Sequence, residues 1–209
     1  AAAVDRCTPE AEALGAVNCV VADDGMLVGH NTDGGGFIDG LSHDTGLDMG
    51  GRRAVVLGAG GAARAVIRAL GEAGAAEVAV VNRTRDRAVG AAALAGSVGR
   101  VVDGDDTAGA LANADLVVNA TPLGMAGTAS GTDLPVDPKL VPDGAVTVDL
   151  IYHPAETAWM AALRRRGIEV HGGLSMLVFQ AARAFVLWTG EEAPVETMAT
   201  AARSALVAR

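Results

Sequence analysis

The chain has 209 residues, of which 50% are apolar, 3% aromatic and 20% charged, and its net charge is −9. The length suggests one or two domains. The negative charge argues against nucleic acid or an anionic membrane as a partner, because both need a basic face; its simplest meaning is solubility. No run of about 18 apolar residues is present, so we expect no transmembrane helix.

The N-terminal region gives weak information about location. Cys7 and Cys19 lack C-x-x-C or zinc spacing, so we predict two free thiols in a reducing cytoplasm and no metal site. The start, Ala1-Ala2-Ala3, lacks the basic and apolar regions of a signal peptide. Because the first residue is not Met and the chain enters directly into a helical pattern, we expect that a natural N-terminal segment is missing.

The first 45 residues predict a small mixed unit. Residues 1–14 read as a helix interrupted at Thr8-Pro9, with Thr8 as N-cap and Pro9 in the first turn. Strands at 16–22 and 26–29 flank the turn signal at 23–25 and predict a hairpin. A glycine-rich loop at 31–36 and a short helix at 36–41 should follow, and the glycine-rich stretch 45–51 marks a domain boundary.

From residue 52 the pattern changes to alternating strands and helices. The continuous apolar run at 54–57 is typical of a parallel strand that is buried on both faces. Further strands are predicted at 77–81, 100–102, 116–120, 145–150 and 169–170, and helices at 61–73, 85–95, 108–113, 175–189 and 194–207. The predicted fold class is α/β, with a Rossmann-type doubly wound parallel sheet in 46–173 and a partial, discontinuous α/β domain made of 1–45 and 174–209.

A glycine motif follows the first buried strand. Gly58-Ala59-Gly60-Gly61-Ala62-Ala63 opens a helix and fits the spacing G-x-G-x-x-G/A. Gly58 permits the tight turn, Gly60 lets the backbone approach a pyrophosphate, and Ala63 lets the helix pack closely on the strand. Glycines also simply end strands. The strand before, the helix after and the second strand at the expected distance nevertheless favour a dinucleotide site at a helix N-terminus.

The end of the second strand predicts which dinucleotide binds. An NAD enzyme usually has a carboxylate there for the ribose 2′-hydroxyl, whereas this chain has Asn82-Arg83-Thr84 and then Arg87. Guanidinium groups suit a 2′-phosphate because they bind it with forked, charge-assisted hydrogen bonds. We therefore predict NADP(H); the alternative is a solvated basic turn.

Two more polar segments lie where ligands of open α/β sheets bind. Asn31-Thr32-Asp33 puts a carboxylate on the loop beside the domain boundary, and Asn119-Ala120-Thr121 ends the fourth strand. From spacing alone, Asp33 is equally well interpreted as the N-cap of the following helix.

These segments, taken together and in order, resemble the shikimate dehydrogenase family. The matching segments span nearly the whole chain: Gly15-Ala16-Val17-Asn18, Asn31-Thr32-Asp33-Gly34, 58–64, Asn82-Arg83-Thr84, Asn119-Ala120-Thr121-Pro122, Asp149-Leu150-Ile151-Tyr152 and 172–180.

The resemblance implies a role for each matching residue. Asp33 matches the catalytic residue, which also contacts substrate, and Asn18, Tyr152 and Gln180 match further substrate contacts. The implied cofactor contacts are Gly58, Ala59, Gly60, Gly61, Ala62, Asn82, Arg83, Thr84, Arg87, Asn119, Ala120, Thr121, Ile151 and Gly173. Gln180 is also a polar amide among apolar neighbours, which would need partners such as a polyhydroxy acid. The alternatives are an amide satisfied by the backbone for Gln180 and a core aromatic for Tyr152.

The resemblance also implies what this stretch lacks. Family members begin with a Ser-rich carboxylate-binding motif and an Asn-x-Thr-x-Pro-x-Lys motif, whose Lys partners the catalytic Asp. Neither motif occurs here, and Lys139 lies in a predicted surface loop. Without the early strands, the second domain should expose an apolar face and a bare sheet edge. We expect NADP(H) affinity with little turnover.

The implied function is the reversible, NADP-dependent reduction of 3-dehydroshikimate to shikimate, a step toward chorismate and the aromatic amino acids. The alternatives are a quinate/shikimate dehydrogenase that uses NAD, and an inactive nucleotide-binding module. The expected partner is the small-molecule substrate, in the cytoplasm, and the sequence leaves a homodimer open.

Overall fold

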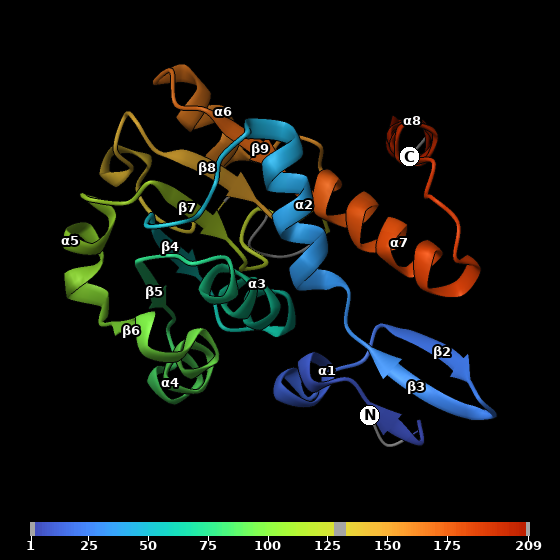
Figure 1. Cartoon of the computed structure of the whole chain (residues 1–209). Helices are drawn as coiled ribbons and strands as arrows, with labels where there is room; N and C mark the ends of the chain where they lie inside the picture. The colour runs from blue at the N-terminus through green and yellow to red at the C-terminus, as the bar shows by residue number, and fades with distance from the viewer. Residues whose placement is uncertain (1–2, 128–132, 208–209) are drawn as a thin grey trace.

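The computed structural model describes residues 3–127 and 133–207, which form two sheets (Figure 1). The larger sheet is six-stranded and parallel throughout, with the order β6-β5-β4-β7-β8-β9. Its strands are β4 (Arg53–Leu57), β5 (Glu77–Val81), β6 (Gly99–Val102), β7 (Leu116–Asn119), β8 (Val146–Asp149) and β9 (Val170–Gly172). The predicted α/β class with a doubly wound parallel sheet is confirmed.

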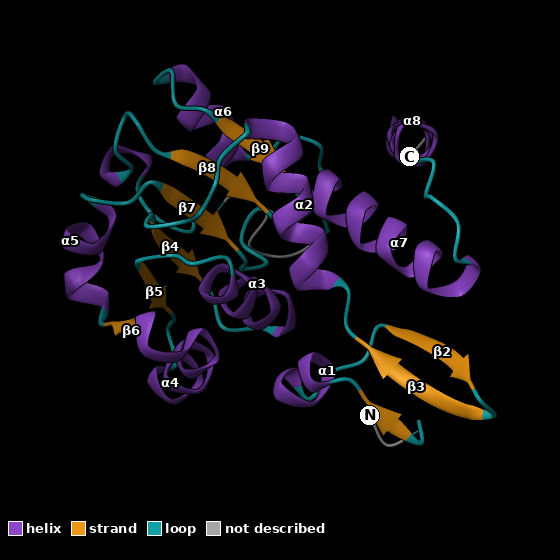
Figure 2. Ribbon diagram, in the orientation of Figure 1, coloured by secondary structure: helices purple, strands orange, loops and turns teal. Residues whose placement is uncertain are grey.

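Helices cover both faces of this sheet (Figure 2). One face packs against α2 (Asp33–Thr45), α3 (Gly61–Glu72) and α4 (Arg85–Ala92), around Phe37, Ile67 and Leu70. The other packs against α5 (Thr107–Leu111) and α6 (Ala158–Arg165), around Trp159 and Leu163. Since the central strands are buried on both sides, their sequences are continuously apolar, which is why the sequence revealed them.

The smaller sheet has the order β1-β3-β2, with β1 (Arg6–Cys7), β2 (Cys19–Asp23) and β3 (Met26–His30). The predicted hairpin is confirmed, as is the cap of α1 (Pro9–Leu14), where the Thr8 hydroxyl accepts from the Ala11 N–H at 3.4 Å. The helix predicted to start at residue 1 is wrong at 6–7, where the backbone forms strand β1 and pairs with β3. Because β3 is about 20 residues away in sequence, the residues around 6–7 do not themselves indicate this pairing. Residues 1 and 2 lie outside the described residues.

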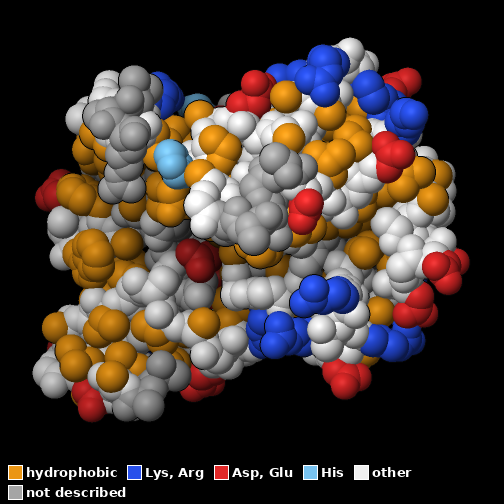
Figure 3. Space-filling view, turned by 180° about the vertical axis from the view of Figure 1, so that it is seen from behind, with side chains coloured by type: hydrophobic (Ala, Val, Ile, Leu, Met, Phe, Trp, Pro, Cys, Tyr) orange, Lys and Arg blue, Asp and Glu red, His pale blue; other side chains and the backbone are white. Residues whose placement is uncertain are grey.

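The small sheet presents apolar side chains to solvent, as Figure 3 shows from behind, at its lower left. Val20, Met26 and Leu27 are each more than two-fifths exposed, and β2 is an edge strand. The indole N–H of Trp188, on α7 (Leu174–Thr189), donates to the Val20 carbonyl at 2.9 Å. The expected apolar face is therefore present, and within residues 3–127 and 133–207 the hydrogen bond from Trp188 is the one that reaches the outer edge of β2 from outside the small sheet.

The glycine-rich start of α2 differs from the prediction, because the expected loop over 31–36 is helical from Asp33. A Cβ on Gly36 would lie 2.4 Å from the backbone N of Gln180, and one on Gly34 would lie 2.9 Å from the Ala65 carbonyl oxygen. The glycines therefore serve close packing of α2 against α7 and α3, and this tertiary contact outweighs their poor helix propensity. In Figure 1, α2 and α7 lie side by side.

Other boundaries differ more modestly. The helix predicted over 85–95 ends at Ala92 and continues as a 3₁₀ helix over Ala93–Val98, and α6 was not predicted. Shorter 3₁₀ turns lie at Gly104–Asp106 and Pro138–Leu140, and α8 (Val195–Val207) follows α7. None of the helices in the described part of the chain is long and apolar enough to span a membrane.

Candidate active site

The turn between β4 and α3 is shaped by two glycines with different constraints. Gly58 has φ +115°, and a Cβ there would lie 2.9 Å from the Ala120 carbonyl oxygen. Gly60 has an ordinary φ of −78°, and a Cβ there would meet no atom within 4 Å. No side chain of a described residue caps α3. Its first N–H groups, at the positive end of the helix, are therefore open to an anion.

This turn borders a cavity of about 530 Å³, here named the Gly58 cavity. It is lined by most of the predicted cofactor contacts and some neighbours: Gly58, Ala59, Gly60, Asn82, Arg83, Thr84, Arg87, Ala120, Thr121, Pro122, Leu123 and Pro135, with Leu57 and Val81 from the strands. Gly61 and Ala62 are exposed in the first turn of α3, outside this lining. The volume falls in the range of small-molecule and cofactor sites.

Two guanidinium groups stand at the edge of the Gly58 cavity. Arg83 and Arg87 are exposed, and neither is paired with a carboxylate within the described ranges. Arg85 between them instead pairs with Asp103. The Asn82 amide donates to the Thr84 carbonyl at 2.8 Å, which fixes the turn that carries Arg83. The site thus offers unpaired positive charge at the position where an NAD enzyme has a carboxylate that binds the ribose 2′-hydroxyl.

A second polar group forms where the small sheet meets α2 and α7. The Asn18 amide N–H donates to the Asp33 carboxylate at 2.7 Å, and the Asn18 oxygen accepts from the Thr32 backbone N–H at 2.9 Å. The Thr32 hydroxyl lies 3.4 Å from the Gln180 amide oxygen. The structure therefore brings together Asn18, Asp33 and Gln180 through the buried Thr32, to which sequence reasoning gave no role of its own although it stands inside the Asn-Thr-Asp motif.

The Asp33 carboxylate is not a helix cap. The N-cap position belongs to Thr32, and the Asp33 side chain accepts from Asn18 rather than from the first turn of α2. Burial raises the pKa of Asp33, and the hydrogen bond from Asn18 opposes part of that rise. Among the described residues, no donor bonds to the other carboxylate oxygen of this half-buried group, which leaves that oxygen for a ligand or a proton.

Gln180 combines both interpretations offered for it. Its amide N–H donates to the Leu177 backbone carbonyl at 2.9 Å, as expected of a backbone-satisfied amide, while its oxygen faces Thr32. A cavity of about 520 Å³, the α2–α7 cavity, opens beside this group and is lined by Asn31, Thr32, Phe179 and Arg183 among others. Polar and apolar walls therefore meet next to Thr32.

Tyr152, Ile151 and Gly173 lie elsewhere, in a cavity of about 250 Å³ at the ends of β8 and β9. Tyr152 is 43% exposed, so the core-aromatic alternative is wrong. Gly173 donates its N–H to the Ile151 carbonyl at 3.1 Å, and a Cβ there would lie 2.0 Å from the Leu150 oxygen. In the described part of the chain, no hydrogen bond joins Tyr152 to Asn18, Asp33 or Gln180.

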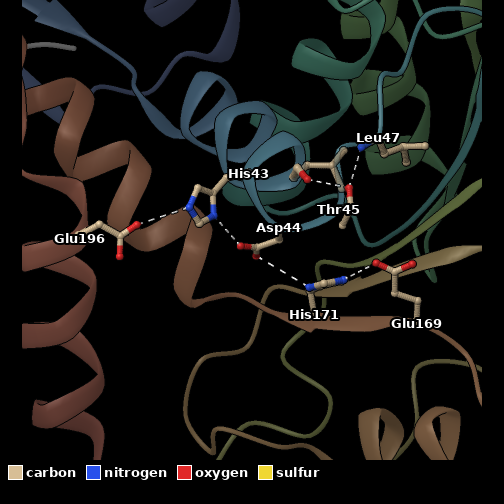
Figure 4. Close-up of polar contacts among 8 residues, drawn as sticks. His43, Asp44, Thr45, Leu47, Glu169, His171 and Glu196 are labelled. Atoms are coloured by element: carbon tan, nitrogen blue, oxygen red, sulfur yellow. Dashed lines mark hydrogen bonds and ion pairs between the residues drawn. The ribbon is translucent and has the colours of Figure 1, made fainter.

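A chain of titratable groups runs from α8 across the end of α2 to β9 (Figure 4). Asp44 lies between two histidines, 3.0 Å from His43 Nδ1 and 3.9 Å from His171 Nδ1. His171 Nε2 is 2.8 Å from Glu169, and His43 Nε2 is 3.7 Å from Glu196. The hydrogen bond to Asp44 raises the pKa of His43. This chain of groups connects α2 to the strand that leads into Gly173.

Asn119 differs from the other predicted cofactor contacts, because it is fully buried. Its amide N–H donates to Asp149 at 2.9 Å, and its oxygen accepts from Thr121. Burial also raises the pKa of Asp149, opposed by hydrogen bonds from Thr157, Ile151 and Asn119. The Asn119 side chain therefore binds the protein itself and does not line the Gly58 cavity.

Known proteins resemble this chain over most of its length. The family model for shikimate / quinate 5-dehydrogenase matches residues 41–124, and the model for the shikimate 5′-dehydrogenase C-terminal domain matches 173–203. A shikimate dehydrogenase (NADP(+)) of Moorella thermoacetica is 46% identical over 209 aligned residues, which cover 97% of this chain and 70% of that protein.

Solved structures agree with the sequence comparison. Shikimate 5-dehydrogenase of Thermus thermophilus, in complex with NADP(H) and shikimate, superposes with a TM-score of 0.86 at 41% identity, covering 98% of this chain and 74% of the other. Quinate dehydrogenase of Corynebacterium glutamicum, in complex with NAD, gives 0.87 at 34% identity, covering 97% and 73%. On this sequence identity and shared fold, the chain belongs to the shikimate dehydrogenase family.

Proposed function

We propose that this chain is an NADP-dependent oxidoreductase that reversibly reduces 3-dehydroshikimate to shikimate, a step in chorismate and aromatic amino-acid biosynthesis. The observation that carries the proposal is the hydrogen-bonded group of Asn18, Thr32, Asp33 and Gln180 in a chain of this family. It offers amide, hydroxyl and carboxylate groups to a polyhydroxy acid, next to the α2–α7 cavity.

The Gly58 cavity fits NADP. A Cβ at Gly60 would stand in open space at the mouth of a helix N-terminus, which is the room a pyrophosphate needs. Arg83 and Arg87 would bind the 2′-phosphate, and Ile151 and Gly173 would border the nicotinamide. When bound, the reduced cofactor NADPH would supply a hydride from C4 of its nicotinamide, and these residues would hold and orient it.

Asp33 is the proposed catalytic residue. Its raised pKa and its free oxygen suit it to hold a substrate hydroxyl and its proton, while Asn18 fixes the direction of the carboxylate. The resemblance assigns a lysine as its partner in proton transfer. The lysine of this chain, Lys139, is exposed in the 3₁₀ turn Pro138–Leu140. We therefore expect the 209 residues to bind NADP(H) but to turn over slowly.

Two measurements on the 209-residue chain test the proposal. Calorimetric titration should show NADP+ binding more tightly than NAD+, and NADP+ reduction with shikimate should be detectable but far slower than in the longer relative from Moorella thermoacetica. If neither nucleotide binds, the proposed cofactor site is wrong. A rate equal to that of this longer relative would refute the need for the lysine partner.

A quinate dehydrogenase that uses NAD is the second candidate, because the relative from C. glutamicum has a similar TM-score. Arg83 and Arg87 favour NADP, since no carboxylate follows Val81 directly to accept from a free 2′-hydroxyl. Tighter NAD+ binding together with quinate turnover would select this candidate. Binding of NADP+ with no turnover of either substrate would instead indicate an inactive nucleotide-binding module.

We further propose that residues 46–173 form the NADP domain and that 1–45 with 174–209 form the substrate domain. The separate hydrogen bonding of the two sheets supports this division, and α2 packs against both α3 and α7 where the two parts meet. The biosynthetic role of the family supports a cytoplasmic location. A homodimer would show in sedimentation or scattering measurements.

A further inference from the structure

A buried carboxylate lies at the carboxyl edge of the large sheet, where the loops after β7 and β8 begin. Asp149 ends β8, is fully buried and is in register with Asn119, which ends β7. Its Oδ1 accepts from the Asn119 amide at 2.9 Å and from the Ile151 backbone N–H at 3.1 Å, and its Oδ2 accepts from the Thr157 hydroxyl at 2.8 Å. Three donors from three segments thus converge on one side chain.

Asn119 connects Asp149 to the turn that lines the Gly58 cavity. With its N–H engaged by Asp149, its oxygen must point the other way, where it accepts from the Thr121 N–H at 3.0 Å and from the Thr121 hydroxyl at 2.7 Å. Reversing the Asn119 amide would place its N–H donors against the Thr121 N–H and its oxygen against the Asp149 carboxylate. The carboxylate therefore fixes the amide orientation, which holds the turn containing Ala120 and Thr121, both of which line the cavity.

The other two bonds fix the second loop. Ile151 and the neighbouring Tyr152 line the cavity that includes Gly173. The Thr157 hydroxyl also accepts from the Met160 N–H at 3.2 Å and so caps α6, and a Cβ on Gly124 would lie 3.3 Å from Thr157 Cβ. Asp149 therefore ties both loops that border the proposed nicotinamide position to the start of α6.

Hydrogen-bond donors, and not a cation, surround the Asp149 carboxylate. In the described part of the chain, no arginine, lysine or histidine pairs with Asp149. A buried charge without a cation is costly, and here the cost is offset by three hydrogen bonds whose donors would otherwise be buried without this acceptor. What an apolar side chain lacks is three acceptor positions, which here determine the orientation of the loops.

We infer that Asp149 is a positioning residue of the nucleotide site, acting through Asn119 and Ile151 without touching the cavity itself. The inference rests on the proposed function, since it assumes that the Gly58 cavity binds NADP(H). Asp149 holds the Thr121 turn and the loop at Ile151 in one orientation before the nucleotide binds. Binding then has less loop motion to remove, so it costs less conformational entropy.

Asp149→Asn and Asp149→Leu test the inference, with Thr157→Val as a control that removes the Oδ2 bond and the side-chain cap of α6 but leaves both Oδ1 bonds in place. We expect Asp149→Leu to keep a cooperative thermal transition while NADP+ binding weakens roughly five- to thirtyfold, as for the loss of one or two hydrogen bonds. Asp149→Asn should recover part of this loss, because its oxygen can still accept from Asn119 and Ile151. A purely structural role predicts that Tm falls and the Kd for NADP+ stays unchanged.

Two further readouts make the outcome decisive. Hydrogen exchange of the nucleotide-free protein should be faster in residues 120–124 and 150–153 of Asp149→Asn than of the wild type, whether or not NADP+ binds. The effects of Asn119→Ala and Asp149→Asn on Kd should not be additive. Unchanged exchange, or unchanged Kd in a folded Asp149→Leu protein, would overturn the inference. Failure of the wild type to bind NADP+, with faster exchange in the variant, would refute the proposed function alone.

Discussion

Gly58 and Gly60 make a sharp test, because the same methyl group should have opposite consequences at two positions of one turn. At Gly58, alanine would take a φ of +115° and place its Cβ 2.9 Å from the Ala120 oxygen and 3.1 Å from the Ala120 carbonyl carbon. A backbone conformation of this kind costs about 1–3 kcal/mol in other residues, and overpacking adds about 1–3 kcal/mol. We therefore expect Gly58→Ala to lower the free energy of unfolding by roughly 2–6 kcal/mol.

At Gly60 the same change should leave stability alone. The φ of −78° suits alanine and no atom lies within 4 Å of its Cβ, so the free energy of unfolding should stay within about 0.5 kcal/mol of the wild type. The added methyl would instead occupy the approach to the first N–H groups of α3. Repulsion of about 1–3 kcal/mol against the pyrophosphate corresponds to roughly 5- to 150-fold weaker NADP+ binding.

Urea unfolding and calorimetric titration of NADP+ separate the two effects. Gly58→Ala should shift the unfolding midpoint strongly and Gly60→Ala hardly at all, while Gly60→Ala should lose affinity for NADP+ at unchanged stability. Equal midpoints for the two variants would refute the steric argument. Wild-type affinity in Gly60→Ala would show that the phosphates bind elsewhere.

The remaining predictions concern charge. Arg83→Gln and Arg87→Gln should each weaken NADP+ binding by roughly 10- to 100-fold, the value of a hydrogen bond between charged groups, and leave NAD+ binding nearly unchanged; Arg85→Gln is the control because Arg85 already pairs with an aspartate. Equal losses for both nucleotides would contradict a 2′-phosphate contact. Because Asp44 raises the pKa of His43, the stabilisation from this pair is fully present below the unfolded pKa of about 6.5 and is lost as pH rises through the folded value. The Tm difference between wild type and His43→Gln should accordingly be larger at about pH 5.5 than at about pH 8, and a difference that grows with pH would rule this out.

The large sheet was predictable because its physics is local. A strand such as Glu77–Val81 is covered on both faces, so its apolar composition predicts it. Its observed bounds are the predicted ones. The sequence of α6, which was not predicted, nevertheless contains a typical helix start and end. Thr157 is its N-cap, and Arg164 and Arg165 lie in its last turn. By contrast, the helical glycines of α2 were unpredictable, since the close approach of α3 and α7, which are distant in sequence, explains them.

The same distinction holds for the site. The glycine turn and Arg83 could be predicted, because a short segment contains both the geometry and the chemistry. The link from Asn18 to Asp33 spans 15 residues, and Thr32 reaches Gln180 across 148. No periodicity reports such contacts, so the resemblance alone suggested that these residues meet.

Asn119 lies at the edge of the sheet where the cofactor is predicted to bind, but its buried side chain does not line the Gly58 cavity. Its position at the end of β7 implied contact with the cofactor, because the carboxyl ends of parallel strands form the ligand edge. The register of β7 with β8 sets Asn119 opposite Asp149, and both side chains are fully buried. A buried amide must then satisfy its donors and its acceptor within the protein. Asn119 does so through Asp149 and Thr121, so its constraint comes from holding the ligand edge in shape.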